Sequence, residues 1–175
     1  NDINLKESLQ SPSKEHWLGT DHLGRDIFSR LLYGATTSFT IAISVVAFAL
    51  IWGIALGGIA GYFGGLSDDI ISRVIDLLLS FPSMIFALAI VGALGSSVLN
   101  LIMALALVHW ASYARLMRGQ VLSAKSNDYV SSARVIGASD RRILVKHILP
   151  NALAPVVVLA TLDMGHVILS AAALS

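Results

Sequence analysis

The chain of 175 residues contains no cysteine and very little charge. Without cysteine, disulfides and thiolate metal sites are excluded, and the redox compartment stays open. Asp, Glu, Lys and Arg together make up only 13% of the residues, whereas 55% are hydrophobic, a balance outside the range of soluble domains. None of these four charged types occurs in residues 31–67 or 77–114, and each window exceeds the roughly 20 residues that cross a bilayer. The sequence therefore predicts an all-α membrane protein.

Motifs for catalysis and nucleotide binding are absent as well. The sequence has no HExxH zinc motif, no GxxxxGKS or GxxxxGKT phosphate loop and no nucleophile elbow. We therefore expect that this chain is not an enzyme and binds no cofactor itself. Its net charge of +1 gives no reason to expect nucleic-acid binding, because the positive residues collect in one membrane-flanking loop.

The two ends of the sequence indicate a fragment of a longer protein. Asn1 is not an initiator methionine, the residues that follow it lack the apolar core of a signal peptide, and Ser175 ends an apolar run without a helix stop signal. We divide the chain into a polar segment over 1–30, expected to be extracytoplasmic, and a transmembrane domain over 31–175.

Four membrane crossings are predicted within these residues. A structured loop and a short interfacial helix are expected before the first span, over about 37–62. The second span is expected from about Asp68 to Gly95, the third over about 98–117, and the last from Pro150 to Ser175. Small residues that permit close helix packing in lipid recur in the first span: Gly53, Gly57, Gly58 and Gly61.

The breaks between these spans follow from helix-breaking residues. Gly64–Gly65 is expected to end the first span, and Ser67 to cap the next helix. Pro82 is expected to kink or restart the second span. Gly95–Ser97 is expected to form a short turn, because one unbroken helix as far as Ala114 is too long for a single crossing.

A basic loop over 118–150 indicates the orientation. Basic residues in and beside this loop far outnumber its two acids, Asp128 and Asp140, and such loops stay on the cytoplasmic side. The N-terminal segment and the turn near Ser96 then lie outside, and the Gly64–Arg73 segment lies inside. The basic residues are Arg115, Arg118, Lys125, Arg134, Arg141, Arg142 and Lys146.

Within this loop the sequence predicts a helix, a turn and a second helix. The first helix is expected over 129–136, the turn at Gly137–Asp140, and the second helix over 141–149, closed by Pro150. A glycine gives the turn its permissive backbone, and the Ser or Asp that follows can cap the second helix. The residues alone leave two interpretations open, a solvated hairpin that tethers two spans and a docking site for a soluble partner.

The loop resembles the cytoplasmic signature of the inner-membrane permeases of binding-protein-dependent ABC importers, in the branch that carries peptides, dipeptides and nickel. That signature has two alanines after a glutamate, a glycine four positions on, and Leu-Pro ending thirteen residues after the glycine. The residues that keep this spacing are Ala133, Gly137, Leu149 and Pro150. Ser131 and Ser132 replace the glutamate and the first alanine, and His147 replaces the usual isoleucine.

The resemblance covers nearly the whole chain, including the segments HWLGTDHLGRDIFSRLLYGA and GYFGGLSDDIISRVIDLLLSFP. It implies a type I ABC importer transmembrane domain, a MetI-like helical bundle, with about four or five transmembrane helices in this fragment. It also implies a multi-pass protein of the bacterial cytoplasmic (inner) membrane, surrounded by membrane lipid. The residues implied to dock an ATPase are Tyr129, Ser131, Ser132, Ala133, Gly137, Ala138, Ser139, Leu149 and Pro150.

The partners implied by the resemblance are a second permease subunit in a heterodimer, two cytoplasmic ABC ATPase subunits and an extracytoplasmic substrate-binding protein. ATP-Mg would be bound and hydrolysed on the ATPase subunits.

Asp163 and His166 are the best candidates for contact with the cargo. They lie three residues apart in LDMGH and so share one face of a helix, and an ionisable residue inside a membrane normally faces a pore or a partner. His109, in HWASYAR, is expected near the inner membrane boundary. The HWAxYAR and LDxGH patterns resemble the nickel permeases, and imidazole with carboxylate suits a borderline divalent cation.

The leading interpretation is therefore a translocation subunit for nickel, a related divalent metal or a metal chelate, with a dipeptide or oligopeptide permease as the alternative. An intramembrane metallohydrolase needs His109, Asp163 and His166 to converge, and the expected depths of the two histidines argue against it. A structural membrane scaffold is a further alternative. A cluster in the polar N-terminal segment matches no metal-site spacing and is expected to be solvated: His16, Asp21, His22 and Asp26.

Overall fold

The computed structural model describes residues 4–95 and 97–174. In chain order its elements are η1 (Leu5–Glu7), α1 (Ile27–Phe63), α2 (Gly65–Ser80), α3 (Ser83–Leu94), α4 (Val98–Lys125), α5 (Asp128–Val135), α6 (Asp140–Arg142), η2 (Ile143–Ile148) and α7 (Leu149–Leu174). Among the described residues the only β-type pairing is one isolated bridge, between Thr20 and Asp26. The predicted all-α class is therefore confirmed. The contacts divide the chain into two units, Asn1–Thr40 and Ile41–Ser175, and each is described by itself.

The first unit is a small folded loop region rather than an unstructured tail. The buried hydroxyl of Thr20 accepts a hydrogen bond from the backbone amide of Gln10 (2.9 Å) and donates one to the carbonyl of Glu7. Asp21 accepts hydrogen bonds from the backbone amides of Leu23 (2.8 Å) and Arg25 (3.0 Å). These bonds satisfy backbone groups that no helix or sheet would otherwise satisfy.

The first long helix begins earlier than predicted. A separate interfacial helix before a span at 37 was wrong, because α1 is continuous from Ile27 to Phe63. The polar residues near its start do not interrupt it, since the hydroxyls of Thr36 and Thr37 donate to the carbonyls of Leu32 (2.9 Å) and Tyr33 (3.0 Å), four residues back. This internal bonding makes threonine compatible with an apolar helix.

In the second unit the glycines of α1 let its backbone pack directly on α4. A Cβ added at Gly53 would lie 2.5 Å from Cβ of Tyr113, and one added at Gly57 would lie 2.3 Å from the carbonyl oxygen of Ala114. A Cβ added at Gly61 would likewise lie 2.8 Å from the carbonyl oxygen of Arg118. The predicted close packing at small residues is thus realised by α1 against α4, at three of the four glycines.

The chain turns sharply twice between α1 and α4. Gly64 and Gly65 take positive φ values of 68° and 55°, which favour glycine, and α1 ends there as predicted. The predicted cap at Ser67 is wrong, because α2 already begins at Gly65 and Ser67 lies inside it. Pro82 lies at the N-cap of α3 and restarts the helix, at 90° to α2.

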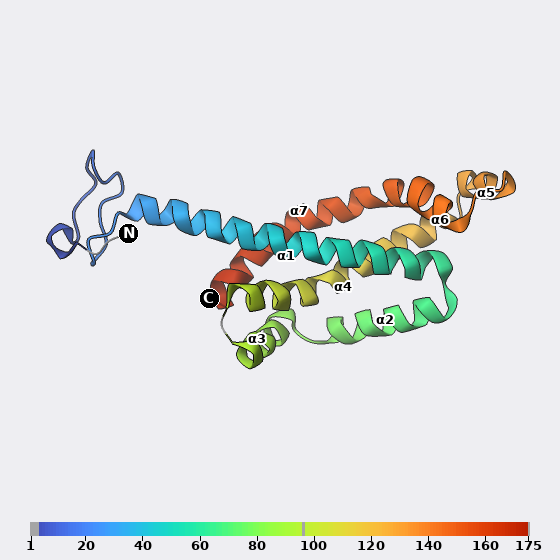
Figure 1. Cartoon of the computed structure of the whole chain (residues 1–175), viewed down its shortest axis with the longest axis horizontal. Helices are drawn as coiled ribbons and strands as arrows, with labels where there is room; N and C mark the ends of the chain where they lie inside the picture. The colour runs from blue at the N-terminus through green and yellow to red at the C-terminus, as the bar shows by residue number, and fades with distance from the viewer. Residues whose placement is uncertain (1–3, 96, 175) are drawn as a thin grey trace. The chain divides into compact units, whose positions relative to one another are not determined.

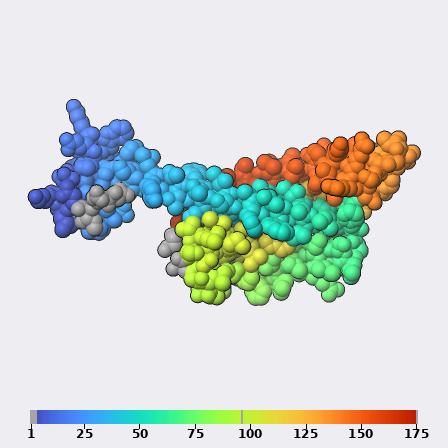
Figure 2. All heavy atoms as spheres, in the orientation of Figure 1, coloured from blue at the N-terminus to red at the C-terminus, as the bar shows by residue number. Residues whose placement is uncertain are grey.

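The helix of the predicted third span continues beyond residue 117, because α4 runs on to Lys125 into the segment that was expected to be loop. It contacts α2, α3 and α7 and so forms the centre of the second unit (Figure 1). In Figure 2 the α2 and α3 segments lie along one edge of this unit, and the α5 to α7 segments lie along the opposite edge.

Pro150 does not close the second loop helix, which contradicts the prediction. Residues 140–174 form one continuous helix, in which η2 is a stretch of π-helix that widens the turn just before Pro150. A proline donates no backbone hydrogen bond and crowds the carbonyl four residues back, and the wider turn accommodates it. The side chain of Asn151 donates instead to the carbonyl of His147 (2.8 Å).

Three helices are long and apolar enough to cross a membrane: Ile27–Phe63, Val98–Lys125 and Asp140–Leu174. The bent pair of α2 and α3 makes a fourth if it is counted as one broken span. By length and composition the described residues therefore hold three candidate spans, and the four predicted crossings are reached only if the bent pair counts as one span.

Candidate functional site

An open cavity lies inside the second unit, where α2, α3, α4 and α7 meet. Its volume is about 550 Å³, and its lining combines apolar side chains with hydroxyls, imidazoles and a carboxylate. The polar lining residues are Ser83, His109, Ser112, Asp163, His166 and Ser170. All three sequence-predicted candidates for contact with cargo therefore face one cavity.

Asp163 is the centre of the polar contacts in this cavity. Its Oδ2 lies 3.0 Å from Nδ1 of His109 and accepts a hydrogen bond from the hydroxyl of Tyr113 at 2.9 Å. Its Oδ1 lies 3.5 Å from Nδ1 of His166. Because an ionised carboxylate only accepts hydrogen bonds, the His109 contact requires a proton on Nδ1 of the imidazole.

The convergence of His109 with Asp163 corrects the depth expected for His109. With α4 extended to Lys125, His109 lies in the middle of that helix and not at its inner end. The depth argument against three converging residues was therefore wrong. A metal centre is still not formed, because among residues 4–95 and 97–174 no group of three His, Cys, Asp or Glu side chains is placed to hold a metal ion.

Tyr113 is the member of this site that the sequence analysis missed. Its side chain is fully buried, and it lies one helical turn beyond His109 on the same face of α4. The i, i+4 spacing of His109 and Tyr113 is a signal that the sequence does contain.

The loop after α4 presents an apolar tip. Val135 and Ile136 are 87% and 84% exposed, and Gly137 follows them with a φ of +84°, which reverses the chain. Val130 and Ala133 lie on the other face of α5 and are buried, and α5 contacts η2. One face of this short helix thus anchors it while the other projects two large apolar side chains.

The remaining predicted loop residues lie around this tip. Ser139 occupies the N-cap of α6, but its side chain makes no capping hydrogen bond. Ser131, Ser132 and Ser139 are exposed, and so is Pro150. Tyr129 is 39% exposed, whereas Ala138 and Leu149 are partly buried against the core.

Polar contacts join this loop to the C-terminal end of α1, and join α1 and α2 to the C-terminal part of α4. The hydroxyl of Tyr62 donates to Oδ1 of Asp140 (2.6 Å), and Nζ of Lys125 donates to the carbonyl of Tyr62 (2.6 Å). Arg118 and Asp68 form a two-armed ion pair, with Nη2 donating to Oδ2 at 2.6 Å. Segments predicted to lie on the cytoplasmic side therefore meet at one end of the unit.

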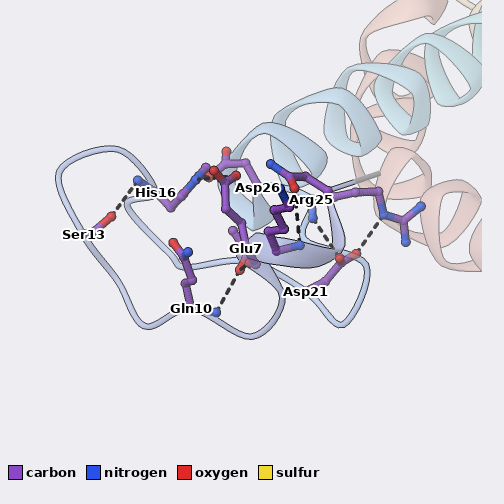
Figure 3. Close-up of polar contacts among 10 residues, drawn as sticks. Glu7, Gln10, Ser13, His16, Asp21, Arg25 and Asp26 are labelled. Atoms are coloured by element: carbon purple, nitrogen blue, oxygen red, sulfur yellow. Dashed lines mark hydrogen bonds and ion pairs between the residues drawn. The ribbon is translucent and has the colours of Figure 1, made fainter. Parts of the chain in front are cut away.

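The polar cluster of the first unit is a structural network (Figure 3). His16 lies between two acids, with Nδ1 at 3.1 Å from Asp26 and Nε2 at 3.8 Å from Glu7. Asp21 pairs with the guanidinium groups of Arg25 (2.9 Å) and Arg30. These pairings join three acids of this segment to His16 and two arginines.

Two carboxyl groups of this network have depressed pKa values. Partial desolvation raises the pKa of Asp21, but hydrogen bonds from the amides of Arg25 and Leu23 and the Arg25 guanidinium outweigh it and hold the pKa below its usual range. Hydrogen bonds from the hydroxyl and amide of Ser29 lower the pKa of Asp26. Both groups therefore stabilise the fold in their ionised form.

Comparison with known proteins identifies the family. The model of the family described as "Binding-protein-dependent transport system inner membrane component" matches residues 53–175. The chain belongs to this family, and the predicted resemblance and the predicted inner-membrane location are both confirmed. Its relatives are permease proteins, in agreement with the expectation that the chain is not itself an enzyme.

Individual relatives cover several cargo types. Over 99% of its length the chain is 47% identical to 57% of the dipeptide transport system permease protein DppC of Alkalihalophilus pseudofirmus. It is 42% identical over 99% of its length to 62% of the nickel transport system permease protein NikC of Escherichia coli. It is 43% identical over 95% of its length to 55% of the glutathione transport system permease protein GsiD of Pectobacterium atrosepticum. The chain thus spans less than two thirds of the length of these relatives.

Proposed function

We propose that this chain is the translocation part of a permease subunit in an ABC importer, and that cargo passes through the cavity around Asp163. One observation carries the proposal: two of the helices that line the cavity, α4 and α7, also extend to the loop. α4 contributes His109 and continues to Lys125, and residues 140–174, which contribute Asp163, begin at the end of the loop.

A displacement of the loop therefore moves the walls of the cavity. Helices behave as rigid rods over these lengths, so a push on the α5 tip changes the separation of α4 and α7 at His109 and Asp163. The exposed Val135 and Ile136 suit an apolar groove on a partner. In this proposal the partners are two cytoplasmic ATPase subunits that bind ATP-Mg, a second permease subunit and an extracytoplasmic substrate-binding protein.

A small peptide is the cargo that we propose first. The cavity of about 550 Å³ has both apolar and polar lining, within the range of small-molecule sites, and a dipeptide permease is a relative at 47% identity. Nickel or a nickel chelate is the second candidate. It is favoured by the proximity of two imidazoles to Asp163 and by the relative named as a nickel permease.

The first experiment compares cells with and without the full-length gene. We expect loss of labelled dipeptide uptake with unchanged cellular nickel, cobalt and zinc by elemental mass spectrometry. A nickel deficit with normal dipeptide uptake would replace the first cargo with the second.

A loop variant tests the coupling. Ile136→Asp places a charge on the exposed apolar tip, and we expect loss of uptake with unchanged abundance in the membrane. Ile136→Leu is the matched control and should retain uptake. Normal uptake by the Asp variant would contradict a docking role for α5.

A further inference from the structure

The two oxygens of Asp163 have different surroundings. Oδ2 has two partners, His109 and Tyr113, at 3.0 and 2.9 Å. Within the described residues Oδ1 has a single polar neighbour, Nδ1 of His166 at 3.5 Å. The His166 side chain is 76% exposed, so its contact with Oδ1 is easily exchanged for another. One oxygen of this carboxylate is thus held in place, and the other is available to a ligand in the cavity.

Among the described residues of the cavity lining, no lysine or arginine balances the charge of this carboxylate. Asp163 is the only carboxylate among these lining residues. The hydrogen bonds from His109 and Tyr113 come from neutral groups when the imidazole is neutral, so they orient the carboxylate without neutralising it. A carboxylate among apolar side chains is costly unless a cation accompanies it.

We propose that Oδ1 of Asp163 binds the ammonium group of the cargo, and that His109 and Tyr113 are positioning residues for it. An ammonium group has three hydrogen-bond donors and no acceptor. The same cavity offers further acceptors, namely the imidazole of His166, which contacts Oδ1, and the hydroxyls of Ser112 and Ser170 in the cavity lining. This inference rests on the proposed function and specifies its cargo as molecules with a free primary amine.

The apolar part of the same cavity indicates what accompanies the amine. Leu78, Leu79, Phe81, Leu159 and Leu169 line it together with the polar residues. An amine with an adjoining apolar group satisfies both parts, as in a peptide with a free amino terminus and an apolar first side chain. A bare divalent ion fits less well, because the described residues form no three-ligand metal group.

The inference is tested by ligand binding to the complete purified permease–ATPase complex without the substrate-binding protein, whose own selectivity would otherwise dominate. The probes are alanyl-phenylalanine and its N-acetyl derivative, which differ in the ammonium group. We expect the free amine to bind at least about tenfold more tightly, because a charge-assisted hydrogen bond is lost on acetylation. In Asp163→Asn we expect this ratio to fall to about one, with affinity for the N-acetyl form unchanged.

Two further variants separate binding from folding. Tyr113→Phe keeps the carboxylate but removes one of its positioning bonds, so the ratio should lie between those of the wild type and Asp163→Asn. Asp69→Asn removes an exposed carboxylate that lies outside the cavity lining and should leave the ratio unchanged. Thermal unfolding of each complex shows whether a variant has kept its fold.

The outcomes separate this inference from the proposed function. Equal binding of the two probes, together with normal ATP-dependent dipeptide uptake, would overturn the ammonium site and leave the permease function standing. Nickel that displaces the dipeptide in the wild type but not in Asp163→Asn would also overturn it, in favour of a metal site. Absence of any ATP-dependent uptake would overturn the proposed function itself.

Discussion

The packing of α1 on α4 gives the sharpest quantitative prediction. Gly57→Ala adds a Cβ that would lie 2.3 Å from the carbonyl oxygen of Ala114, and 2.9 and 3.0 Å from two further backbone atoms of that residue. Because these are all backbone atoms, no side-chain rotation relieves the clash, and the two helices must separate. Overpacking of this kind costs about 1–3 kcal/mol. Any intrinsic gain in helix propensity from glycine to alanine is about 1 kcal/mol at most and only partly offsets that cost.

The adjacent glycine provides the matched control. A Cβ at Gly58 would meet one atom within 4 Å, the flexible Cδ2 of Leu149 at 3.5 Å, an ordinary van der Waals contact. Gly58→Ala should therefore be neutral or slightly stabilising. The assay is thermal unfolding of the full-length protein in detergent, followed by tryptophan fluorescence. Equal stability of the two variants, or a less stable Gly58→Ala, would refute the packing geometry.

Three further predictions concern polar contacts. Arg118→Ala breaks the two-armed pair with Asp68, in which the Arg118 and Asp68 side chains are 34% and 18% exposed. The free energy of unfolding should fall by about 1–2 kcal/mol, a cost between those of breaking an exposed and a buried ion pair. Urea unfolding checks this, and the charge-swapped double variant should recover part of the loss. Tyr62→Phe removes the bond to Asp140 and should raise the ATP hydrolysed per molecule transported, with an unchanged ratio arguing against a coupling role. Because the pKa of Asp21 is depressed in the folded state, the folded state binds fewer protons than the unfolded state. The Asp21 carboxylate therefore contributes fully to stability above the ordinary pKa of about 3.9, and this contribution is lost as the pH falls towards the folded pKa. Hydrogen exchange of the first unit should show this loss, and Asp21→Asn should remove that pH dependence.

The elements were predictable where the signal was local. The helix breaks at Gly64–Gly65 and Pro82 depend on backbone restrictions of those residues alone. The shared face of Asp163 and His166 follows from helical spacing, and the structure places them 3.5 Å apart. Pro150 shows the limit of such rules, because the π-helical turn before it let the helix continue.

Helix ends were mispredicted where a charge has a partner far away in the sequence. The third span was expected to end near residue 117, beside Arg115 and Arg118, and these arginines pair with Asp76 and Asp68 of α2. A charge neutralised by a neighbouring helix need not leave the bundle, so α4 continues beyond both arginines. The sequence holds both members of each pair, but not the helix packing that brings them together.

The early end predicted for the third span also explains why the sequence analysis did not bring His109 and Asp163 into one cavity. Ending the third span early placed His109 at a membrane face, and so separated it from Asp163. In the structure α4 continues to Lys125, and its His109 and Tyr113 lie beside Asp163 and contact one of its oxygens. The pairs of Asp68 and Asp76 with Arg118 and Arg115 join α2 to the helix that holds His109 and Tyr113. Their loss should alter the selectivity of the cavity as well as the stability of the bundle, which Arg118→Ala would reveal as a reduced preference for the free-amine dipeptide over its N-acetyl form.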